Sequence, residues 1–247
     1  MDIDGRVLDL LGRETRFGDV RLVERTGSTN DVAAAEAAGG APEGLVVSAD
    51  FQSSGRGRLD RTWEARAGDG LLVSVLLRPA GLPRARRALV PSAVALAARA
   101  ACREVAGVVP EIKWPNDLLD GEGAKLAGIL AVESAGAVVV GLGLNVHGAP
   151  PGATCLDRMA GRRVERAELL VAWLRKLDPL LDRWDEVARR YRAECATVGR
   201  RVAVELAAGQ VVTGTVEGVD DLGLLVLRDD DGSVSALAAG DVTHLRW

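Results

Sequence analysis

The stretch that most limits the possible folds is the apolar run LLVSVLL at residues 71–77. It lacks the regular alternation of polar and apolar side chains, and such a run is typical of a strand buried on both faces of a sheet. Other segments with strand character lie at 21–24, 45–49, 112–114, 125–134 and 137–146. The chain therefore holds the strands of one substantial sheet.

Helical patterns alternate with these strands. The alanine-rich residues 31–38 favour a helix, which the polar residues 28–30 can cap. Further helical patterns run from Pro83 to near Gly107, over 166–177 and over 180–194. Strands mixed with helices predict an α/β fold, a mixed sheet backed by helices, for a first domain over residues 1–195.

The sequence changes character from Val198 onwards. Short β-type runs, broken by glycine or aspartate, occupy the rest of the chain. Runs of this kind suit a small β-barrel. We therefore expect a second domain over residues 196–247, appended to the first.

Composition restricts the class and the location of the protein. A hydrophobic fraction of 48% supplies a core, and a net charge of −4 argues against a dedicated nucleic-acid binder. Cys102, Cys155 and Cys195 are far apart, so we expect buried thiols in a reducing compartment and neither a zinc site nor a disulfide framework. The N-terminus lacks the apolar core of a signal peptide, and no apolar run is long enough to span a bilayer. These features predict a soluble, cytoplasmic protein.

A cationic loop follows the strand at 45–49. Residues 50–63 read DFQSSGRGRLDRTW, in which Gly55 and Gly57 alternate with arginines before Trp63. Glycine lets backbone N–H groups approach a ligand, arginine suits phosphate or carboxylate oxygens, and a base can stack on the indole. The loop is interpreted as a clamp for a nucleotide-like anion. A solvated, mobile loop and a segment that binds single-stranded nucleic acid are the alternatives.

Several polar residues at the ends of predicted elements have two interpretations each. Residues 28–30 (Ser-Thr-Asn) either cap the next helix or form a polar pocket wall. Asn116 and Asp117 follow a proline and either form an ordinary turn or face a ligand. Lys125, at the start of a strand, is either an exposed cation or a charge aimed at a phosphate or carboxylate.

Glycines inside the strand at 137–146 indicate close approach by a ligand or by another segment. Gly141 and Gly143 lack the third glycine and the following helix of a dinucleotide-binding fingerprint. The chain also contains no P-loop, which excludes a Walker-type ATP site. Asn145 is the polar residue at the end of this strand.

Taken in order, these motifs resemble those of the biotin protein ligases, which attach biotin to the carrier domain of biotin-dependent carboxylases. The motifs are Ser28-Thr29-Asn30, Gln52 with GRGRLDRTW at 55–63, KWPND at 113–117, KLAGIL at 125–130 and GLGLNV at 141–146. The resemblance covers nearly the whole chain. It implies a class II synthetase-like catalytic domain followed by an SH3-like β-barrel.

The resemblance also implies a reaction in two steps. Biotin and ATP, with Mg²⁺, would give biotinyl-5′-AMP and pyrophosphate, and a lysine of the carrier domain would then displace AMP. The first predicted strand begins at Arg21, which leaves too few residues before it for the winged helix–turn–helix of the family's repressors. The implied protein binds no DNA and is a monomer or a weak homodimer. Asp60 stands where the family loop often has glycine, which affects the flexibility expected of the loop.

The resemblance assigns roles to individual residues. Lys125, Arg58 and Asp117 are implied to be catalytic, with Asp117 either helping to hold Mg²⁺ or orienting the incoming lysine amine. The residues implied to bind biotin are Ser28, Thr29, Asn30, Gln52, Gly55, Arg56, Gly57, Arg58, Lys125 and Gly128. The residues implied to bind ATP are Arg58, Arg61, Trp63, Asn116, Lys125 and Asn145.

Two other functions are compatible with parts of this pattern. A lipoate or octanoate ligase shares the catalytic fold by analogy and would activate a linear acyl chain. A non-enzymatic nucleic-acid-binding module would use the Arg–Gly loop and the C-terminal barrel. The acidic net charge and the 3% aromatic content disfavour this second function.

Overall fold

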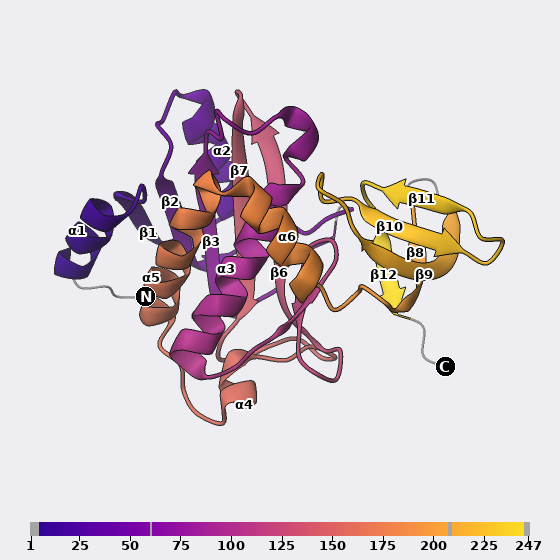
Figure 1. The fold of residues 1–247 in the computed structure, drawn as a ribbon. Helices are drawn as coiled ribbons and strands as arrows, with labels where there is room; N and C mark the ends of the chain where they lie inside the picture. Colours follow the sequence, from indigo (N-terminus) through magenta and orange to yellow (C-terminus); the bar gives the residue numbers. More distant parts are fainter. Residues whose placement is uncertain (1–4, 60, 207–208, 245–247) are drawn as a thin grey trace.

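The computed structural model describes residues 5–59, 61–206 and 209–244, which form two sheets and a set of helices (Figure 1). The first elements are α1 (Gly5–Glu14), β1 (Asp19–Thr26), α2 (Thr29–Ala38), β2 (Leu45–Gln52), β3 (Gly70–Leu77), η1 (Arg84–Arg86), α3 (Leu89–Ala106), β4 (Glu111–Lys113), β5 (Asp117–Leu119), β6 (Lys125–Ser134) and β7 (Ala137–Asn145). They are followed by α4 (Leu156–Ala160), α5 (Arg166–Leu177), η2 (Asp178–Asp182), α6 (Trp184–Glu194), β8 (Arg201–Glu205), β9 (Val211–Val219), β10 (Leu225–Asp229), β11 (Val234–Leu237) and β12 (Asp241–His244).

The larger sheet has seven strands in the order β1-β2-β3-β7-β6-β5-β4. β1 and β2 are parallel and the other neighbours are antiparallel, so the sheet is mixed, as the sequence predicted. β3 lies inside the sheet, and every residue of Gly70–Leu77 is buried. The non-alternating apolar run is therefore a strand covered on both faces.

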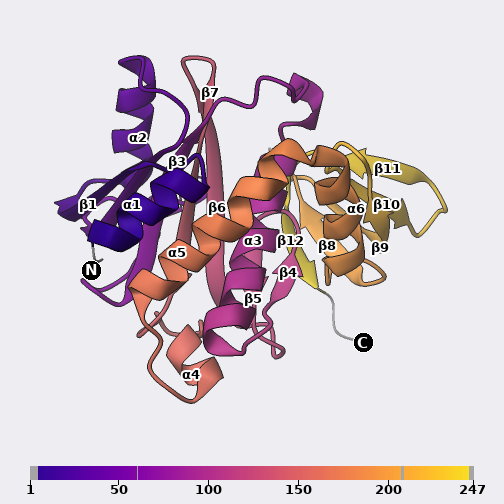
Figure 2. The same ribbon diagram turned by 60° about the vertical axis from the view of Figure 1, so that its left-hand side comes forward.

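Helices cover both faces of this sheet. α2 packs against β2, β3 and β7 on one face, where Ala33, Leu76 and Val139 share a small core cluster. α3 lies on the other face with α5 and α6 packed against it (Figures 1 and 2), and Val75 and Val140 belong to the larger core there. Since successive side chains of a strand point to opposite faces, the neighbours Val75 and Leu76 fall into different cores.

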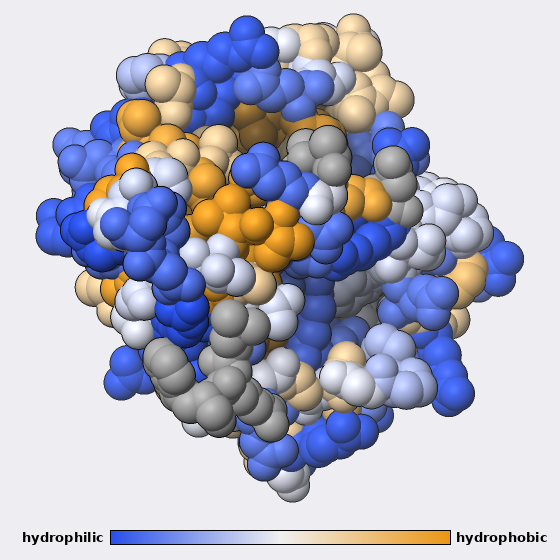
Figure 3. Space-filling view, turned by 90° about the vertical axis from the view of Figure 1, so that its right-hand side faces the viewer, coloured by the Kyte–Doolittle hydropathy of each residue, from blue (hydrophilic) through white to orange (hydrophobic). Residues whose placement is uncertain are grey.

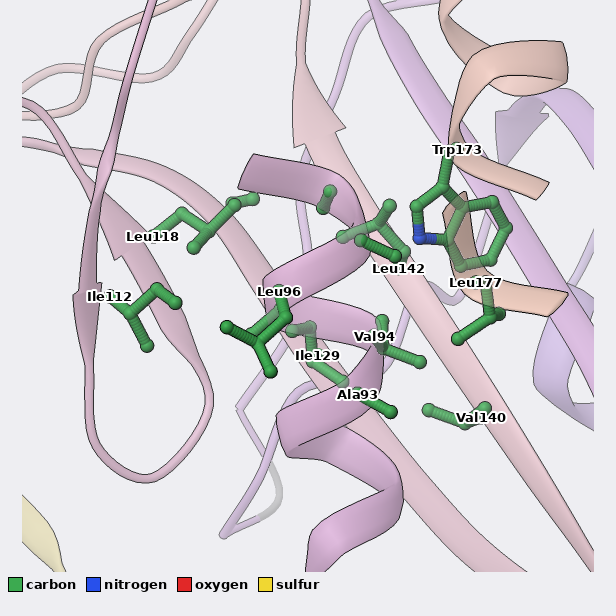
Figure 4. Close-up of a cluster of buried hydrophobic side chains, with 14 of the residues drawn as sticks. Ala93, Val94, Leu96, Ile112, Leu118, Ile129, Val140, Leu142, Trp173 and Leu177 are labelled. Carbon is green, nitrogen blue, oxygen red and sulfur yellow. The ribbon is translucent and has the colours of Figure 1, made fainter. Parts of the chain in front are cut away.

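The larger core centres on α3. Figure 4 shows Ala93 and Leu96 of this helix beside Ile129 of the sheet, with Trp173 of α5 close by. Trp173 is fully buried, and so are the apolar side chains Leu169, Leu170, Leu174 and Leu177 of the same helix. The helical predictions for these two long segments are confirmed.

The second sheet has five antiparallel strands in the order β11-β10-β9-β8-β12 and lies at one end of the molecule (Figure 1). The prediction of a small C-terminal β module is confirmed. The backbone N–H of Trp114 donates to Thr197 Oγ1 at 3.1 Å, and its indole N–H donates to the Gly223 carbonyl at 3.1 Å. These contacts tie the C-terminal module to the segment after β4.

The surface around this module is largely polar. Figure 3 shows mainly hydrophilic side chains on this side of the molecule, with smaller hydrophobic areas between them. Within the described ranges, no helix combines the length and the hydropathy that crossing a membrane requires. Cys102, Cys155 and Cys195 are free and buried, and burial raises the pKa of Cys102 to about 12, so this thiol is protonated at neutral pH.

Three local predictions are corrected by the structure. Asp117, expected in a turn, is the first residue of β5, because its backbone pairs with Gly128 of β6. The segment 147–163, where no helix was predicted, contains α4. No helix was predicted over Gly5–Glu14, where α1 buries Leu11 completely. Short elements depend on contacts with distant residues, and local sequence does not contain those contacts.

Candidate active site

A cavity of about 130 Å³ opens on the face of the larger sheet that carries α2. Its walls come from the start of α2, the β2–β3 connection, the strand β3, the turn before β5 with Asp117, and the strands β6 and β7. The first residue of β12, Asp241, completes the wall from the C-terminal module. The cavity therefore gathers segments from most of the chain.

The β2–β3 connection folds into a hairpin beside the cavity. Arg56 and Thr62 form an antiparallel bridge, and the N–H of Trp63 donates to the carbonyl of Gly55 at 2.9 Å. A Cβ on Gly55 would lie 2.4 Å from the carbonyl oxygen of Trp63, so only glycine fits. The Arg–Gly segment is therefore a shaped hairpin whose base is closed by backbone contacts.

The indole of Trp63 lies against two glycines of the sheet. Gly128 of β6 and Gly143 of β7 face each other in the register. A Cβ on Gly143 would lie 2.6 Å from Cε2 of Trp63, and one on Gly128 would lie 3.0 Å from its Cζ3. The indole Nε1 is buried and has no hydrogen-bond partner among the described residues. The strand glycines thus mark the close approach of another segment, as predicted.

A polar recess lies on the same face of the sheet, beside Gly141, two residues along β7 from Gly143. Gly141 leaves room for Asn30, because a Cβ on that glycine would lie 2.5 Å from Oδ1 of Asn30. The Asn30 amide Nδ2 donates to the Leu130 carbonyl at 3.1 Å. Gln52 Oε1 accepts from the backbone N–H of Thr29 at 2.7 Å and lies 3.0 Å from its hydroxyl oxygen. The recess therefore holds several fixed hydrogen-bonding groups.

Ser28 decides between the two interpretations of residues 28–30. It occupies the N-cap position of α2 with an extended backbone, but its side chain makes no capping hydrogen bond. The residue is 3% exposed and lines the cavity. The pocket-wall interpretation therefore fits the structure better than simple helix capping.

Lys125 begins β6 and lines the cavity with its side chain. Its Nζ lies 2.7 Å from Oδ1 of Asp117, in an ion pair whose angles fall outside hydrogen-bond geometry. Nζ also lies 5.7 Å from the ring centre of Trp63, within the range of cation–π attraction. The Lys125 side chain is 40% exposed, so the cation is positioned and still accessible to a ligand.

The hairpin directs Arg58 to the boundary between the two sheets. Its Nη1 donates to Oδ1 of Asn116 at 3.1 Å and to the carbonyl of Gly240 at 3.2 Å. Burial lowers the pKa of Arg58, while the charges of Asp117 and Asp241 act in the opposite direction. An arginine stays charged at neutral pH, so the site contains a partly desolvated cation, which attracts an anion more strongly than one in water.

The other two arginines of the hairpin make different contacts. Arg61 pairs with Asp241, and this hydrogen bond raises the pKa of Arg61. Burial alone would raise the pKa of Asp241, but the hydrogen bond and charge of Arg61 leave it lowered. Arg56 instead lies 3.3 Å from Asp31 in the first turn of α2, with both side chains exposed. The C-terminal module therefore holds one side of the hairpin.

The structure brings most of the predicted site residues to this one cavity. Gly55 and Asn145 are not in its wall. Asn145 is buried, and its amide donates to the carbonyls of Lys125 and Thr154 at 3.4 and 3.1 Å. Asp60 lies outside the described residues. The predicted residues that line the cavity are Ser28, Thr29, Asn30, Gln52, Arg56, Gly57, Arg58, Arg61, Trp63, Asn116, Asp117, Lys125 and Gly128.

Some residues of the wall were missed by sequence reasoning. Asp241 is 180 residues away from Arg61, in a segment expected to form a separate module, and no local pattern connects the two. Leu72 and Leu142 also line the cavity, although their only signal was that of buried strands. Such residues enter the site through the fold and not through a motif.

The acidic residues of the cavity fit a magnesium ion that arrives with a nucleotide. Among the described residues, no group of three His, Cys, Asp or Glu side chains could hold a metal. Asp117 and Asp241 are the carboxylates of the described cavity wall. Mg²⁺ keeps several waters and binds through one or two carboxylates together with substrate phosphates. Such an ion would be held by one or both of these carboxylates together with the phosphates of the nucleotide.

Two family models match the chain. The model of the biotin/lipoate A/B protein ligase family matches residues 22–148, and that of the biotin protein ligase C terminal domain matches residues 197–245. The first match includes every described residue of the cavity wall except Asp241, which falls in the second. The two matches therefore contain the whole described cavity.

Individual proteins agree with the family models. The biotin–[acetyl-CoA-carboxylase] ligase of Mycobacterium tuberculosis is 38% identical over 96% of this chain and 93% of its own. The bifunctional ligase/repressor BirA of Bacillus subtilis is 30% identical over 92% of this chain and 73% of its own. The structure of the Aquifex aeolicus biotin protein ligase in complex with biotin and ATP superposes with a TM-score of 0.81 at 25% identity, over 94% of this chain and all of that one. The chain therefore belongs to the biotin protein ligases, within the biotin/lipoate A/B protein ligase family.

Proposed function

We propose that this chain is an ATP-dependent ligase that activates biotin as biotinyl-5′-AMP and transfers it to a lysine of a biotin carboxyl carrier domain. One observation carries the proposal, namely that a polar recess and a set of cations share a single cavity. Thr29 and Asn30 belong to the recess, whereas Arg58, Arg61 and Lys125 supply the cations. The recess suits a compact polar head group, and the cations suit a carboxylate beside a phosphate.

The first step joins two anions, so the site must reduce their repulsion. The biotin carboxylate attacks the α-phosphorus of ATP, a new P–O bond forms, and the bond to pyrophosphate breaks. Lys125 and Arg58 line the cavity and are proposed to neutralise the carboxylate and the α-phosphate, and Arg61 lies further along the hairpin. Fixed cations in a partly dry cavity stabilise developing negative charge strongly. Mg²⁺ bound with ATP would supply further neutralisation of the phosphates.

The second step uses the carboxylate of Asp117, which lies beside Lys125. The amine of the carrier lysine attacks the acyl carbon and loses a proton to solvent, an amide bond forms, and the bond from that carbon to the phosphate oxygen breaks to release AMP. Asp117 is 18% exposed at its side chain and is held by Lys125 before ligands arrive. Once Lys125 turns to the ligand's carboxylate and phosphate, Asp117 is free to orient the incoming amine.

The hairpin protects the intermediate from water. Trp63 is proposed to cover the adenine, and Asn116 is proposed as a nucleotide contact, in line with the sequence resemblance. Asn145, which the resemblance also implies, lies behind the cavity wall, where its amide donates to the carbonyl of Lys125. Leu59 is 63% exposed at the hairpin tip, so it can fold over a bound ligand without breaking core contacts. A segment that closes over a mixed anhydride excludes water while the acceptor is awaited.

The domain boundary and the acceptor follow from the same proposal. We place the boundary at 195/196, between the end of α6 at Glu194 and the start of β8 at Arg201. The acceptor is inferred to be the carrier domain of a biotin-dependent carboxylase, because the M. tuberculosis relative is named as an acetyl-CoA-carboxylase ligase. A cytoplasmic location and a monomeric or weakly dimeric state stay predictions from the sequence.

One experiment tests the function directly. The purified protein is incubated with biotin and MgATP, and biotinyl-5′-AMP and pyrophosphate are measured, first alone and then with a carrier domain whose mass is followed. The expected results are adenylate formation and the addition of one biotin to one lysine. Absence of adenylate contradicts the proposal, whereas faster pyrophosphate exchange with lipoate or octanoate would favour a ligase for linear acids.

A further inference from the structure

β3 carries a single polar side chain, Ser74, within an otherwise apolar strand. Ser74 is fully buried and is not part of the cavity wall. In the sheet it pairs with Gly141 of β7, which pairs in turn with Leu130 of β6. Asn30 lies over this row, so Ser74 supports the polar recess from beneath the cavity.

The Ser74 hydroxyl belongs to a chain of four oxygen atoms. Ser74 Oγ lies 2.6 Å from Oδ1 of Asn30 and 2.7 Å from Oγ1 of Thr29. Thr29 Oγ1 lies 3.0 Å from Oε1 of Gln52, which lines the cavity. All three separations are within hydrogen-bond range. A buried hydroxyl is thereby connected to a group that a ligand can touch.

This chain of oxygens has fewer protons than contacts. Ser74 and Thr29 carry one hydroxyl proton each, and the amide oxygens of Asn30 and Gln52 carry none. The orientation of the Asn30 amide is fixed, because its Nδ2 donates to the carbonyl of Leu130. The two shortest contacts are satisfied when Ser74 donates to Asn30 and Thr29 donates to Ser74. The longest contact, from Thr29 Oγ1 to Gln52 Oε1, is then left without a proton, so Gln52 Oε1 keeps its bond from the backbone N–H of Thr29 and one acceptor position stays open.

We propose that Ser74 is a positioning residue that sets this order of protons and so keeps Gln52 Oε1 open as an acceptor for an N–H group of the ligand. The inference rests on the proposed function, since the cyclic urea of biotin has two N–H groups and the linear acids lipoate and octanoate have no urea. A ligand N–H completes the network. Gln52 Oε1 already accepts from the backbone N–H of Thr29, so an acid without an N–H leaves only its second acceptor position unused and gains one hydrogen bond fewer than biotin. Ser74 therefore contributes to the selection of biotin.

The variant Ser74→Ala removes both the proton that serves Asn30 and the acceptor that serves Thr29. The Thr29 hydroxyl then donates to Gln52 Oε1 and occupies the acceptor position proposed for the N–H group of the ligand. KM for biotin in pyrophosphate exchange is expected to rise roughly 3- to 10-fold, which corresponds to one hydrogen bond. KM for ATP is expected to stay unchanged. A purely structural role would change both constants or neither.

Ser48 offers a matched control on the neighbouring strand. It is 1% exposed on β2, and its hydroxyl donates to the carbonyl of Leu72 at 3.1 Å, apart from the chain of oxygens. Ser48→Ala also removes one buried hydroxyl from the same sheet, so it is expected to leave both KM values unchanged. Thermal unfolding verifies that the variants are folded. Ser74→Cys, with its weakly donating thiol, is a second variant in which KM for biotin should rise.

The outcomes separate this inference from the function on which it rests. If wild-type protein makes adenylate but Ser74→Ala has the KM for biotin of the wild type, the inference is overturned and the function stands. An equal rise in Ser48→Ala, or an equal rise in KM for ATP, overturns the inference as well. A wild-type protein that makes no adenylate from biotin overturns both. Calorimetric titration with biotin alone should give the same fold-change as the kinetic measurement.

Discussion

Lys125 and Asp117 form an ion pair across the neighbouring strands β6 and β5, with Nζ 2.7 Å from Oδ1. The pair joins the KWPND motif to the KLAGIL motif, which the sequence presents as separate units. It also holds the ammonium group 5.7 Å from the ring centre of Trp63 in the cavity wall. The orientation of the cation is thus set before any ligand arrives.

Lys125→Ala should slow adenylate formation by ~10²–10³-fold, the usual effect of removing one fixed donor from an active site. The side chain is 40% exposed, so the fold should be little affected. Pyrophosphate exchange measures the rate. Lys176→Ala is the matched control, because Lys176 is a similarly exposed lysine that pairs with Glu104 outside the cavity. A rate near that of the wild type would show that Lys125 is not catalytic.

Asp241→Asn should loosen the hairpin without destabilising the protein. The Arg61 side chain is 61% exposed, so breaking its pair with Asp241 should change the free energy of unfolding by at most ~1 kcal/mol. Protease cleavage within residues 56–61 should become faster, and added salt should have the same effect on the wild type. Asp230→Asn, which breaks a pair with Arg201 away from the cavity, should not change cleavage. Equal cleavage of all three proteins would contradict the prediction.

Gly143→Ala should displace Trp63 from the sheet. A Cβ at this position would lie 2.6 Å from the indole, which is too close for any real contact. Trp63 must move, so the hairpin should become more sensitive to protease and adenylate formation should fall. Gly218→Ala is the control, because nothing lies within 4 Å of its new Cβ. A Gly143→Ala protein with an intact hairpin and normal activity would show that the hairpin does not depend on the packing of Trp63 against Gly143.

His244 should make the stability depend on pH. Burial, with the charges of Lys113 and Arg200, lowers its pKa to about 4, whereas an unfolded histidine titrates near 6.5. As pH falls, the unfolded chain binds the proton first, so the stability present above pH ~6.5 is lost on the way to pH ~4. Denaturant unfolding of wild type and His244→Gln should therefore show a steeper loss for the wild type over this interval. Equal slopes would contradict the shift.

Much of the architecture could be predicted because its signals are local. Consecutive apolar residues predict strands at 71–77 and at Lys125–Ser134, and both strands are confirmed. α1 was missed although Leu8 and Leu11 have helical spacing, whereas the short element β5 could not be predicted. β5 exists because Asp117 pairs with Gly128, and a pairing partner on another strand leaves no periodic trace.

The site residues also fall into two groups, those with a local sequence signal and those that depend on long-range contacts. The motif residues of the hairpin and of β6 meet in one cavity, as expected from their chemistry. Arg61 was identified as a cation, but its partner Asp241 could not be, since the contact depends on how the C-terminal module docks. Ser74 did leave a signal, as the lone hydroxyl in an apolar strand. The role of Ser74 could not be inferred from the sequence, because it depends on the contact of its hydroxyl with Asn30.

The glycines beneath the indole and beneath Asn30 have a consequence for redesign. Glycine is the smallest residue, so any substitution at Gly128, Gly141 or Gly143 can only make the binding site shallower. A variant intended for bulkier acids must therefore be widened sideways, for instance by shortening Leu72 or Leu142. The depth of the site is at its limit in the natural sequence, and its breadth is the dimension left to change.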